Sequence, residues 1–447
     1  MSFACTHEYD LLIHNGRILT INPSHDDIKR GLVVVQDGVI ADVHGLEEGA
    51  SLPRARQNID AQGGIIMPGL VNTHCHAPMS LFRGLADDLP LMTWLNEHIF
   101  PAEARHINPE SVYIGALLAC AEMVLSGTTS VCDGYFYETR VAEAFRAIGL
   151  RGVLGQGIID FPAPGVADPR KNIEEGVRFI IKWTGVSTLI TPGLFCHSPY
   201  TCSEDTLRRA KEITRSTNAL FQIHAAETKD EVEQIMNRHH TTPVQYLDNI
   251  GIMDENTLLV HAIHLDDADI ECVKKSGAAI SVTTESEMKL ASGIARVPEF
   301  MNHNIRVGLG TDGCASNNDL DLFLEMGMTA RLQKVYGHDP TLMDARKVLT
   351  MATIGGARAI GLGDHIGSIE VGKRADIIVI DTNKPHLTPL YNPYSHLVYS
   401  ASGSDVNHVV IDGKIVVKDR VIQTIDIEYI MDEANRLARL IGEGGRP

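Results

Sequence analysis

The residues with the clearest capacity for chemistry in this 447-residue chain are histidines and acids at the ends of short apolar runs. The first such run ends in Val71-Asn72-Thr73-His74-Cys75-His76. On a β-strand, residues i and i+2 face the same side, so both imidazoles can reach one metal ion. Taken alone the motif is weak, because among 20 histidines a His-x-His pair arises about once by chance.

Three further ligand-type residues follow later apolar runs. His224 ends the run that starts at Ala219, His261 ends the run that starts at Thr257, and Asp312 follows the run Ile305–Thr311. If these runs are parallel strands of one barrel, their carboxyl ends meet at one mouth and the side chains converge there. Imidazole nitrogen and carboxylate oxygen are ligands of Zn²⁺ and of Fe²⁺. The set therefore predicts a metal-dependent hydrolytic site.

Glu227 lies three residues beyond His224. A straight strand would point it away from His224, so we place it where the strand has ended and the loop turns over the site. There a carboxyl group can take a proton from water and pass it to a leaving amine. The fourth run ends in Cys196-His197-Ser198-Pro199-Tyr200, without the lysine that a bridged two-metal site needs. We therefore expect a single metal, with His197 as a substrate contact.

Eight apolar runs alternate with helical stretches across residues 66–364, and this organisation must position the site. Stretches such as Ser111–Leu125, Glu204–Ser216 and Asp266–Lys275 have the helical spacing of apolar residues. The alternation predicts an α/β fold, a TIM-like (β/α)₈ barrel. An open doubly wound sheet is the alternative, but no glycine-rich dinucleotide fingerprint follows the first strand. The runs are Ile65–Thr73, Thr129–Asp133, Gly152–Asp160, Leu189–Phe195, Ala219–His224, Thr257–His261, Ala278–Thr283 and Ile305–Thr311.

Both ends of the chain have the pattern of short strands joined by tight turns. Neither end has enough apolar surface for a core of its own. We therefore expect one small β-sandwich domain, with a C-terminal helix, assembled from residues 1–65 and 365–447. Asp412-Gly413 is a hairpin turn signal, and His14-Asn15-Gly16 indicates a break between two strands. The expected strands are Tyr9–Leu12, Arg17–Ile21, Gly31–Val35, Ala375–Asp381, Val406–Ile411 and Lys414–Val417.

The amino-acid composition limits the kinds of partner that the protein can bind. The formal net charge is −18, from 57 acidic and 39 basic side chains, which argues against a nucleic acid or an anionic membrane as partner. No apolar run has the length of a membrane span, and the segment MSFACTHEYD is polar rather than signal-like. The eight cysteines form no CxxC pair, so we expect reduced thiols and a cytoplasmic protein.

The motifs resemble those of the amidohydrolase superfamily, in its branch of mononuclear aminohydrolases. The resemblance covers essentially the whole chain and is carried by Pro68–His76, Gly310–Gly313 and Gly367–Asp376. Met79–Leu95 and Cys314–Asp321 are most similar to the 5-methylthioadenosine/S-adenosylhomocysteine deaminases. This resemblance implies deamination of an adenine nucleoside, namely 5′-methylthioadenosine, adenosine or S-adenosylhomocysteine, to the inosine analogue and ammonia. It also implies a homo-oligomer.

The same resemblance implies a role for each site residue. Asp312 is the base that first takes the proton of water, Glu227 protonates the ring nitrogen, and His261 acts on water and substrate. Trp94 packs near the sugar, and Glu103 accepts hydrogen bonds from ribose hydroxyls. One divalent ion, zinc in preference to iron, is implied at His74, His76, His224 and Asp312. The implied substrate contacts are Trp94, Glu103, His197, Glu227, Asp312 and Ser316.

Two positions depart from these relatives. Many relatives carry His-(Asn/Cys)-Pro-x-Ser-Asn after the seventh strand, where this chain has Val282-Thr283-Thr284-Glu285-Ser286-Glu287. We expect this run at the barrel mouth, where it would alter the base or leaving-group end of the pocket. Some relatives place near Gln156 an arginine that grips a carboxylate tail. Because glutamine makes no charge-assisted pair, we favour a neutral 5′-substituent over homocysteine, although Gln156 is equally well an ordinary polar strand-end residue.

Two other functions stay open. The first keeps the site but takes an s-triazine, guanine or a pterin as the substrate of an aminohydrolase or chlorohydrolase, and the altered Val282–Glu287 run favours it. Retention of Asp312 argues against the dechlorinating version. The second is a barrel without catalysis that acts as a scaffold, but such a protein loses metal ligands and this chain keeps them all.

Overall fold

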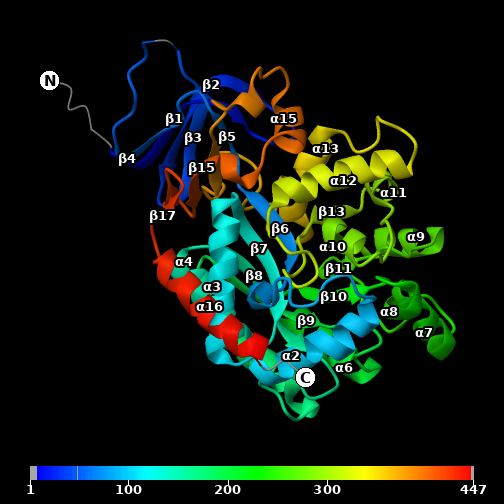
Figure 1. Ribbon diagram of the computed structural model, residues 1–447. Helices are drawn as coiled ribbons and strands as arrows, with labels where there is room; N and C mark the ends of the chain where they lie inside the picture. The colour runs from blue at the N-terminus through cyan, green and yellow to red at the C-terminus, as the bar shows by residue number, and fades with distance from the viewer. Residues whose placement is uncertain (1–7, 48, 444–447) are drawn as a thin grey trace.

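Within residues 8–47 and 49–443, which the computed structural model describes, eight parallel strands form a barrel in the order of the sequence. Its first and last strands meet, since the Asp312 backbone N–H donates to the His74 carbonyl across 3.1 Å. Figure 1 shows these strands at the centre of the molecule. The alternation of apolar runs predicts this architecture correctly. The strands are β6 Leu70–Cys75, β7 Thr128–Tyr135, β8 Arg151–Ile158, β9 Ile190–Cys196, β10 Phe221–Ala225, β11 Thr257–His261, β12 Ala279–Val282 and β13 Arg306–Leu309.

Helices follow the strands and cover the barrel from outside. In α6 the Ser203 hydroxyl caps the helix by accepting the Thr206 N–H, and the buried Leu207, Ala210 and Thr214 form one stripe. The left-handed Asn218 ends that helix. The helices of this layer are α3 Pro109–Leu125, α4 Glu138–Ile148, α5 Asn172–Trp183, α6 Glu204–Thr217, α7 Lys229–His239, α8 Pro243–Asn249, α9 Asp267–Ser276, α10 Thr284–Lys289, α11 Val297–Asn302, α12 Leu322–Tyr336, α13 Ala345–Thr350 and α14 Gly356–Ala359.

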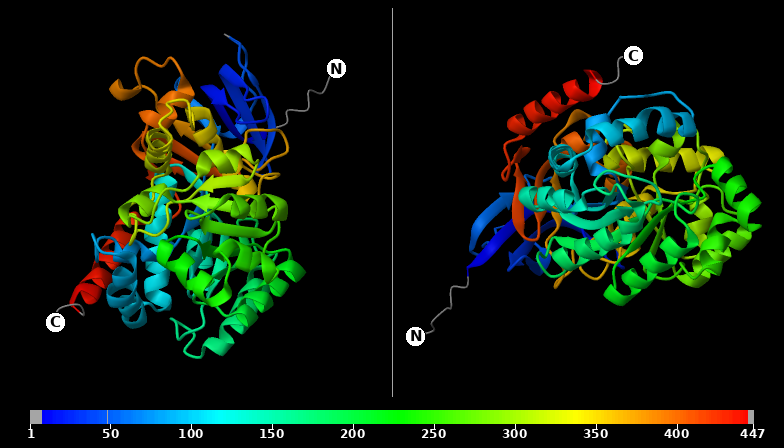
Figure 2. Two further views of the ribbon diagram at one scale, coloured as in Figure 1. Left: turned by 90° about the vertical axis from the view of Figure 1, so that its right-hand side faces the viewer. Right: turned by 90° about the horizontal axis from the view of Figure 1, so that it is seen from below.

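Strands from both ends of the chain share a second sheet, as Figures 1 and 2 show. β5 lies inside it, parallel to β1 and antiparallel to β14. The predicted hairpin at Asp412-Gly413 is confirmed, because both residues have positive φ between β15 and β16. The strands of this sheet are β1 Tyr9–Leu19, β2 Asp27–Gln36, β3 Val39–Gly45, β4 Ala55–Asp60, β5 Ile65–Pro68, β14 Ile377–Ile380, β15 Val406–Ile411, β16 Lys414–Lys418 and β17 Val421–Ile422.

The apolar run Ile65–Thr73 is two strands rather than the one that its sequence predicts. β5 pairs in the terminal sheet and β6 begins the barrel, with Gly69 between them. A Cβ at Gly69 would lie 2.1 Å from the Thr129 side chain, so only glycine fits at this passage. Both strands are fully buried, and no polar residue stands between Ile65 and Val71 to mark the change of sheet.

The expected break at His14-Asn15-Gly16 is also wrong. β1 continues through it, with an irregular register between His14 and Gly16 and a positive φ at Asn15. The turn-like residues therefore form a bulge, which bends a strand without ending it.

The terminal sheet contacts the barrel at the end where the strands begin. Arg151, the first residue of β8, donates to both carboxylate oxygens of Asp376 across 2.7 and 3.0 Å. Both side chains are buried. The opposite, carboxyl end of the barrel is thereby left for a site.

The C-terminal helix α16 Ile427–Glu443 lies along α3, as Figures 1 and 2 show. Its buried Ile430, Ala434, Leu437 and Ile441 recur at helical spacing. Arg436 of this helix pairs with Glu110 of α3. The helix that the sequence predicts therefore packs on the barrel.

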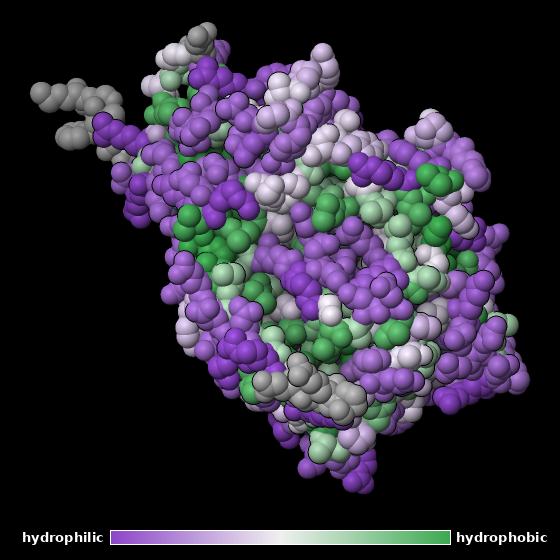
Figure 3. Space-filling model, viewed as in Figure 1, coloured by the Kyte–Doolittle hydropathy of each residue, from purple (hydrophilic) through white to green (hydrophobic). Residues whose placement is uncertain are grey.

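The surface carries no extended apolar face in the view of Figure 3, where apolar side chains gather in small groups between hydrophilic ones. Among the described residues, no helix is both long and apolar enough to cross a bilayer. The seven cysteines in this part of the chain are all free, while Cys5 lies outside the described residues.

Candidate active site

Three histidines meet at the carboxyl end of the barrel. The ligand nitrogens of His74, His76 and His224 all lie within 4.8 Å of one another. His74 Nε2 faces His224 Nε2 at 3.2 Å. Asp312 adds a carboxylate, with Oδ1 at 3.5 Å from Nε2 of both His74 and His76. Three imidazole nitrogens and one carboxylate oxygen in a buried cluster are a donor set that suits Zn²⁺ or Fe²⁺.

Neighbouring groups orient these donors. His76 Nδ1 lies 2.6 Å from the Gly134 carbonyl. Because a carbonyl only accepts, Nδ1 carries the proton and Nε2 presents its lone pair to the cluster. Burial lowers the pKa of His74 to about 4 and also lowers the pKa of His224. Both rings are therefore neutral near pH 7, as metal ligands must be.

Asp312 is held from two sides. Its Oδ2 accepts hydrogen bonds from the hydroxyls of Ser286 and Ser316, both at 2.7 Å. Its Oδ1 accepts the Gly313 N–H at 2.8 Å and faces the histidines. Burial raises the pKa of Asp312, but the hydrogen bond from His74 and the nearby imidazoles outweigh it and hold that pKa well below the ordinary range. The carboxylate is thus ionised and fixed.

Glu227 and His261 lie beside this cluster and face each other, with Oε2 at 3.7 Å from Nε2. β10 ends at Ala225, and a positive φ at Ala226 turns the chain so that Glu227 points over the site. The Glu231 carboxylate fixes that turn by accepting the N–H groups of Ala226 and Glu227, both at 2.8 Å. Burial raises the pKa of Glu227, so its carboxyl group can hold a proton closer to neutral pH.

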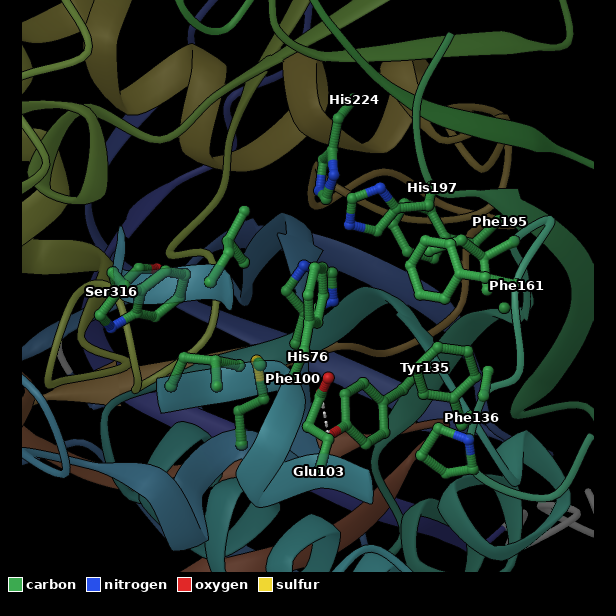
Figure 4. Close-up of a pocket in the computed structure, with 18 of the residues that line it drawn as sticks. His76, Phe100, Glu103, Tyr135, Phe136, Phe161, Phe195, His197, His224 and Ser316 are labelled. Atoms are coloured by element: carbon green, nitrogen blue, oxygen red, sulfur yellow. Dashed lines mark hydrogen bonds between the residues drawn. The ribbon is translucent and has the colours of Figure 1, made fainter. Parts of the chain in front are cut away.

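These residues border a cavity of about 120 Å³, drawn in Figure 4. One end contains the histidines, and the other contains aromatic side chains and Glu103. The structure brings the substrate contacts implied by the resemblance to this one cavity. They are Trp94, Glu103, His197, Glu227, Asp312 and Ser316.

Glu103 reaches the cavity from residues 91–106, which comprise α1 Leu91–Thr93, a π-helical turn Trp94–Ile99 and α2 Phe100–His106. The widened turn precedes Pro101, which has no N–H to continue α-helical bonding. Glu103 is buried and accepts a hydrogen bond from the Tyr135 hydroxyl at 2.5 Å, the dashed line of Figure 4. Burial raises the pKa of Glu103 to about 7.

His197 lies on the cavity wall beyond the end of β9. Its Nδ1 is 3.0 Å from the Thr201 hydroxyl, which leaves Nε2 for the cavity. Burial lowers the pKa of His197 to about 3. The ring is therefore neutral and available to a neutral ligand.

Gln156 is not among the described residues that line the cavity. Its side-chain oxygen accepts the Glu138 N–H at 3.2 Å, and its Nε2 donates to the Gly157 carbonyl at 3.3 Å. Both ends of the amide are thus bonded to backbone. The structure favours the interpretation of Gln156 as an ordinary polar residue near a strand end.

The run Val282–Glu287 lies behind the catalytic groups rather than in the cavity lining. Thr283 Oγ1 is 2.9 Å from His261 Nδ1, and Ser286 donates to Asp312. The residues that replace the common motif of relatives therefore support two of the predicted catalytic side chains, and do not reshape the substrate pocket directly.

Sequence reasoning missed several site residues. It ended the second strand at Asp133, two residues before Tyr135, where β7 ends. It assigned nothing to Glu231, although an acid in the first turn of a helix four residues after Glu227 was a usable signal. The aromatic pair Phe100 and Phe161, with ring centroids 5.7 Å apart, comes from two segments that no sequence pattern brings together.

Comparisons with known proteins agree with this geometry. Residues 65–416 match the amidohydrolase family. A 5-methylthioadenosine/S-adenosylhomocysteine deaminase of Syntrophobacter fumaroxidans is 47% identical over 436 residues, which cover 97% of this chain and 98% of that protein. A 5′-deoxyadenosine deaminase of Methanosarcina mazei is 44% identical over 434 residues, covering 96% and 98%.

Two solved structures with bound zinc have a similar fold. An adenosine deaminase from Xanthomonas campestris with bound zinc has a TM-score of 0.95 and 35% identity, covering 98% of this chain and 99% of its own. An atrazine chlorohydrolase from Arthrobacter aurescens has a TM-score of 0.88 at 20% identity, covering 96% and 100%. At that identity the likeness to the chlorohydrolase concerns the fold alone.

Proposed function

This chain belongs to the amidohydrolase family, and we propose that it deaminates an adenine nucleoside by hydrolysis, releasing ammonia and the inosine analogue. The observation that carries this proposal is the facing pair of Glu227 and His261 beside the histidine cluster, in a cavity that extends to Glu103. An acid–base pair at one end suits the purine ring, and a buried acceptor at the other end suits ribose hydroxyls. The relatives named for deamination of adenosine derivatives support the same reaction.

The metal would be held by His74, His76, His224 and Asp312. Their neutral rings and ionised carboxylate fit one divalent ion, zinc in preference to iron. When bound, such an ion supplies Lewis acidity that lowers the pKa of water towards neutrality.

The chain's own residues move the protons. Asp312 Oδ1 faces the histidines and is ionised, so it accepts a proton from the attacking water. Glu227 delivers a proton to the ring nitrogen beside the attacked carbon, for which its raised pKa suits it. Asp312 then passes the proton that it took from water to the amino group, which leaves as ammonia, and the remaining hydroxyl proton returns to Glu227 as the carbonyl forms. His261 Nε2 faces Glu227, and in this proposal it contacts the water and the new oxygen.

The far end of the cavity would hold the sugar and its 5′-substituent. Glu103 accepts from the ribose hydroxyls, Trp94 packs against the sugar, and His197 contacts the ligand through Nε2. Ser316 contacts the ligand at the metal end, beside Asp312.

The 5′-substituent is neutral in this proposal. Beyond Glu103 the lining is apolar, with Phe100, Phe136 and Phe161, and it includes no lysine or arginine from the described chain. A homocysteine tail would bring a carboxylate to this wall without a cationic partner, which costs free energy. We therefore place 5′-methylthioadenosine, 5′-deoxyadenosine and adenosine ahead of S-adenosylhomocysteine.

The test is a deamination panel. Zinc-loaded protein is incubated with the four nucleosides and with guanine, and ammonia and the loss of adenine absorbance are followed. Fast turnover of the neutral nucleosides supports the proposal. A protein with a full equivalent of bound zinc that releases no ammonia from any adenine nucleoside would overturn it, and turnover of guanine alone would reassign the substrate.

A further inference from the structure

His261 is held from behind by the hydroxyl of Thr283. His261 Nδ1 lies 2.9 Å from Thr283 Oγ1. The Glu287 carboxylate lies behind that hydroxyl, with Oε1 at 3.3 Å from Thr283 Oγ1 and 3.0 Å from Thr283 N. All three side chains are buried. Glu287 Oε1 also lies 3.7 Å from His261 Nδ1, beyond hydrogen-bond distance, so the Thr283 hydroxyl bridges the two side chains.

The chemistry of the groups fixes the direction of these hydrogen bonds. Glu287 as a carboxylate only accepts, so the Thr283 hydroxyl proton points to Glu287. The Thr283 oxygen must then accept, and His261 Nδ1 must donate to it. The reverse orientation would set the hydroxyl lone pairs against the carboxylate in a buried place. Nδ1 thus carries a proton, and Nε2 is the nitrogen that faces Glu227.

The Thr283 hydroxyl is free for this task because another residue caps the helix. Thr283 is the N-cap residue of α10, yet its side chain makes no capping hydrogen bond. A threonine in that position ordinarily accepts an N–H from the first helical turn. Here Glu325, on α12, accepts the N–H groups of Thr284 and Glu285 instead. Because Glu325 caps α10, the Thr283 hydroxyl is available to His261. A threonine that served only as the N-cap would accept these N–H groups itself.

We propose that Thr283 and Glu287 are positioning residues for the deamination, with Glu287 acting through the Thr283 hydroxyl to fix a proton on His261 Nδ1 and to aim Nε2 at the reaction. Its catalytic consequence rests on the proposed function, whereas the state of Nδ1 does not. Thr283 and Glu287, within the run Val282–Glu287, then serve the chemistry of the site from behind the cavity.

The test compares isosteric and conservative variants. Thr283→Val removes the hydroxyl at nearly constant volume, Thr283→Ser keeps it, and Glu287→Gln removes the carboxylate charge. Thr284→Val is the matched control, because Thr284 is equally buried but its hydroxyl bonds Thr329. We expect Thr283→Val to lower kcat by about 10–100-fold, as loss of a hydrogen-bond partner behind an active-site imidazole does, with KM and bound zinc unchanged. Thr283→Ser and Thr284→Val should keep kcat.

Coupling is tested with the double variant Thr283→Val/Glu287→Gln. If Glu287 acts through Thr283, the double variant has the kcat of Thr283→Val alone. Additive losses would overturn the relay. So would a Thr283→Val variant with wild-type kcat, or a Thr283→Ser variant as slow as Thr283→Val.

A readout besides activity is the imidazole proton itself. In zinc-loaded protein with ¹⁵N-labelled histidine, His261 should give a one-bond Nδ1–H correlation, assigned by its loss in His261→Gln. The correlation should persist in Thr284→Val and disappear or shift in Thr283→Val. An unprotonated His261 Nδ1 in the wild type would overturn the inference, even in a protein that deaminates. If the correlation behaves as expected but no nucleoside reacts, the proposed function fails and the assignment of the proton stands.

Discussion

The two ends of the cavity are built in different ways. At the metal end, His74, His224 and His261 belong to barrel strands or end them, and Asp312 follows β13 closely. At the opposite end, where we propose that the sugar binds, Glu103 and Phe161 come from residues 91–106 and from the loop after β8. The hydrogen-bonded ladder of the barrel fixes the first group, while a few side-chain contacts fix the second. Chemistry in this fold is therefore set by the barrel, and substrate choice by what covers its mouth.

The largest effect should come from removing a strand-borne ligand. We expect His224→Asn to lose the bound metal and all measurable deamination, because the shorter polar side chain cannot complete the cluster. Metal analysis and ammonia release after zinc loading measure both. A variant that kept stoichiometric zinc and turnover would show that His224 is not a required metal ligand.

Glu227→Gln should keep the metal but lose the proton transfer. A positioned general acid–base group contributes about 10²–10⁴-fold, so kcat should fall by that order while bound zinc stays at the wild-type level. Single-turnover kinetics with 5′-methylthioadenosine measure the chemical step directly. A fall of less than about tenfold would move the acid–base role to another group.

Glu103→Gln should act on binding instead of chemistry. Loss of a charged hydrogen-bond acceptor costs about 1.5–3 kcal/mol, so KM should rise by about 10–150-fold with kcat nearly unchanged. Steady-state kinetics with adenosine separate the two constants. A loss confined to kcat would mean that Glu103 acts on the chemical step, and that binding and chemistry are not separated between the two ends of the cavity.

The same residue sets an expected pH dependence. Burial raises the pKa of Glu103 to about 7, so below pH 7 the group is increasingly protonated and a worse acceptor for ribose hydroxyls. We expect kcat/KM to fall by about tenfold per pH unit below that pKa. The effect should be absent in Glu103→Gln, and an identical acid limb in both proteins would assign the titration elsewhere.

The smallest effect should come from the aromatic wall. Phe161→Ala removes its edge contact with Phe100, and such pairs contribute about 0.5–1.5 kcal/mol beyond their area. KM for 5′-methylthioadenosine should rise by about 2–13-fold, and KM for adenosine by less, because adenosine has no methylthio group to bury. Equal changes for both would place the 5′-substituent away from this wall.

The sequence predicts the metal end well because strand periodicity and barrel topology are local and regular signals. His74 lies near the end of β6 and His76 directly follows that strand, and the other donors lie at or just beyond strand ends. It predicts the sugar end only through resemblance. Phe100 and Phe161 meet because α2 packs against the loop after β8, and spacing in the chain carries no information about that contact.

The sequence does not predict three other features, each for a physical reason. The change of sheet at Gly69 lies within residues 65–71, which include no polar residue. The side chain of Gln156 is turned to backbone groups of Glu138 and Gly157, contacts that sequence spacing does not predict. The use of Thr283 depends on the substitute cap from Glu325, a residue from another helix.

The position of β5 has a consequence for the order in which the protein is made. Ile65 of β5 pairs with Ile380 of β14. All eight barrel strands lie between these two residues in the sequence, so the ribosome makes β5 before the barrel and β14 after it. Until β14 arrives, the buried side chains of β5 and one free edge lie open to other chains, and such an edge invites aggregation. A chain that terminates shortly before Ile377 would contain every barrel strand. Because β5 would keep its exposed edge, we expect that chain to need chaperones to stay unaggregated.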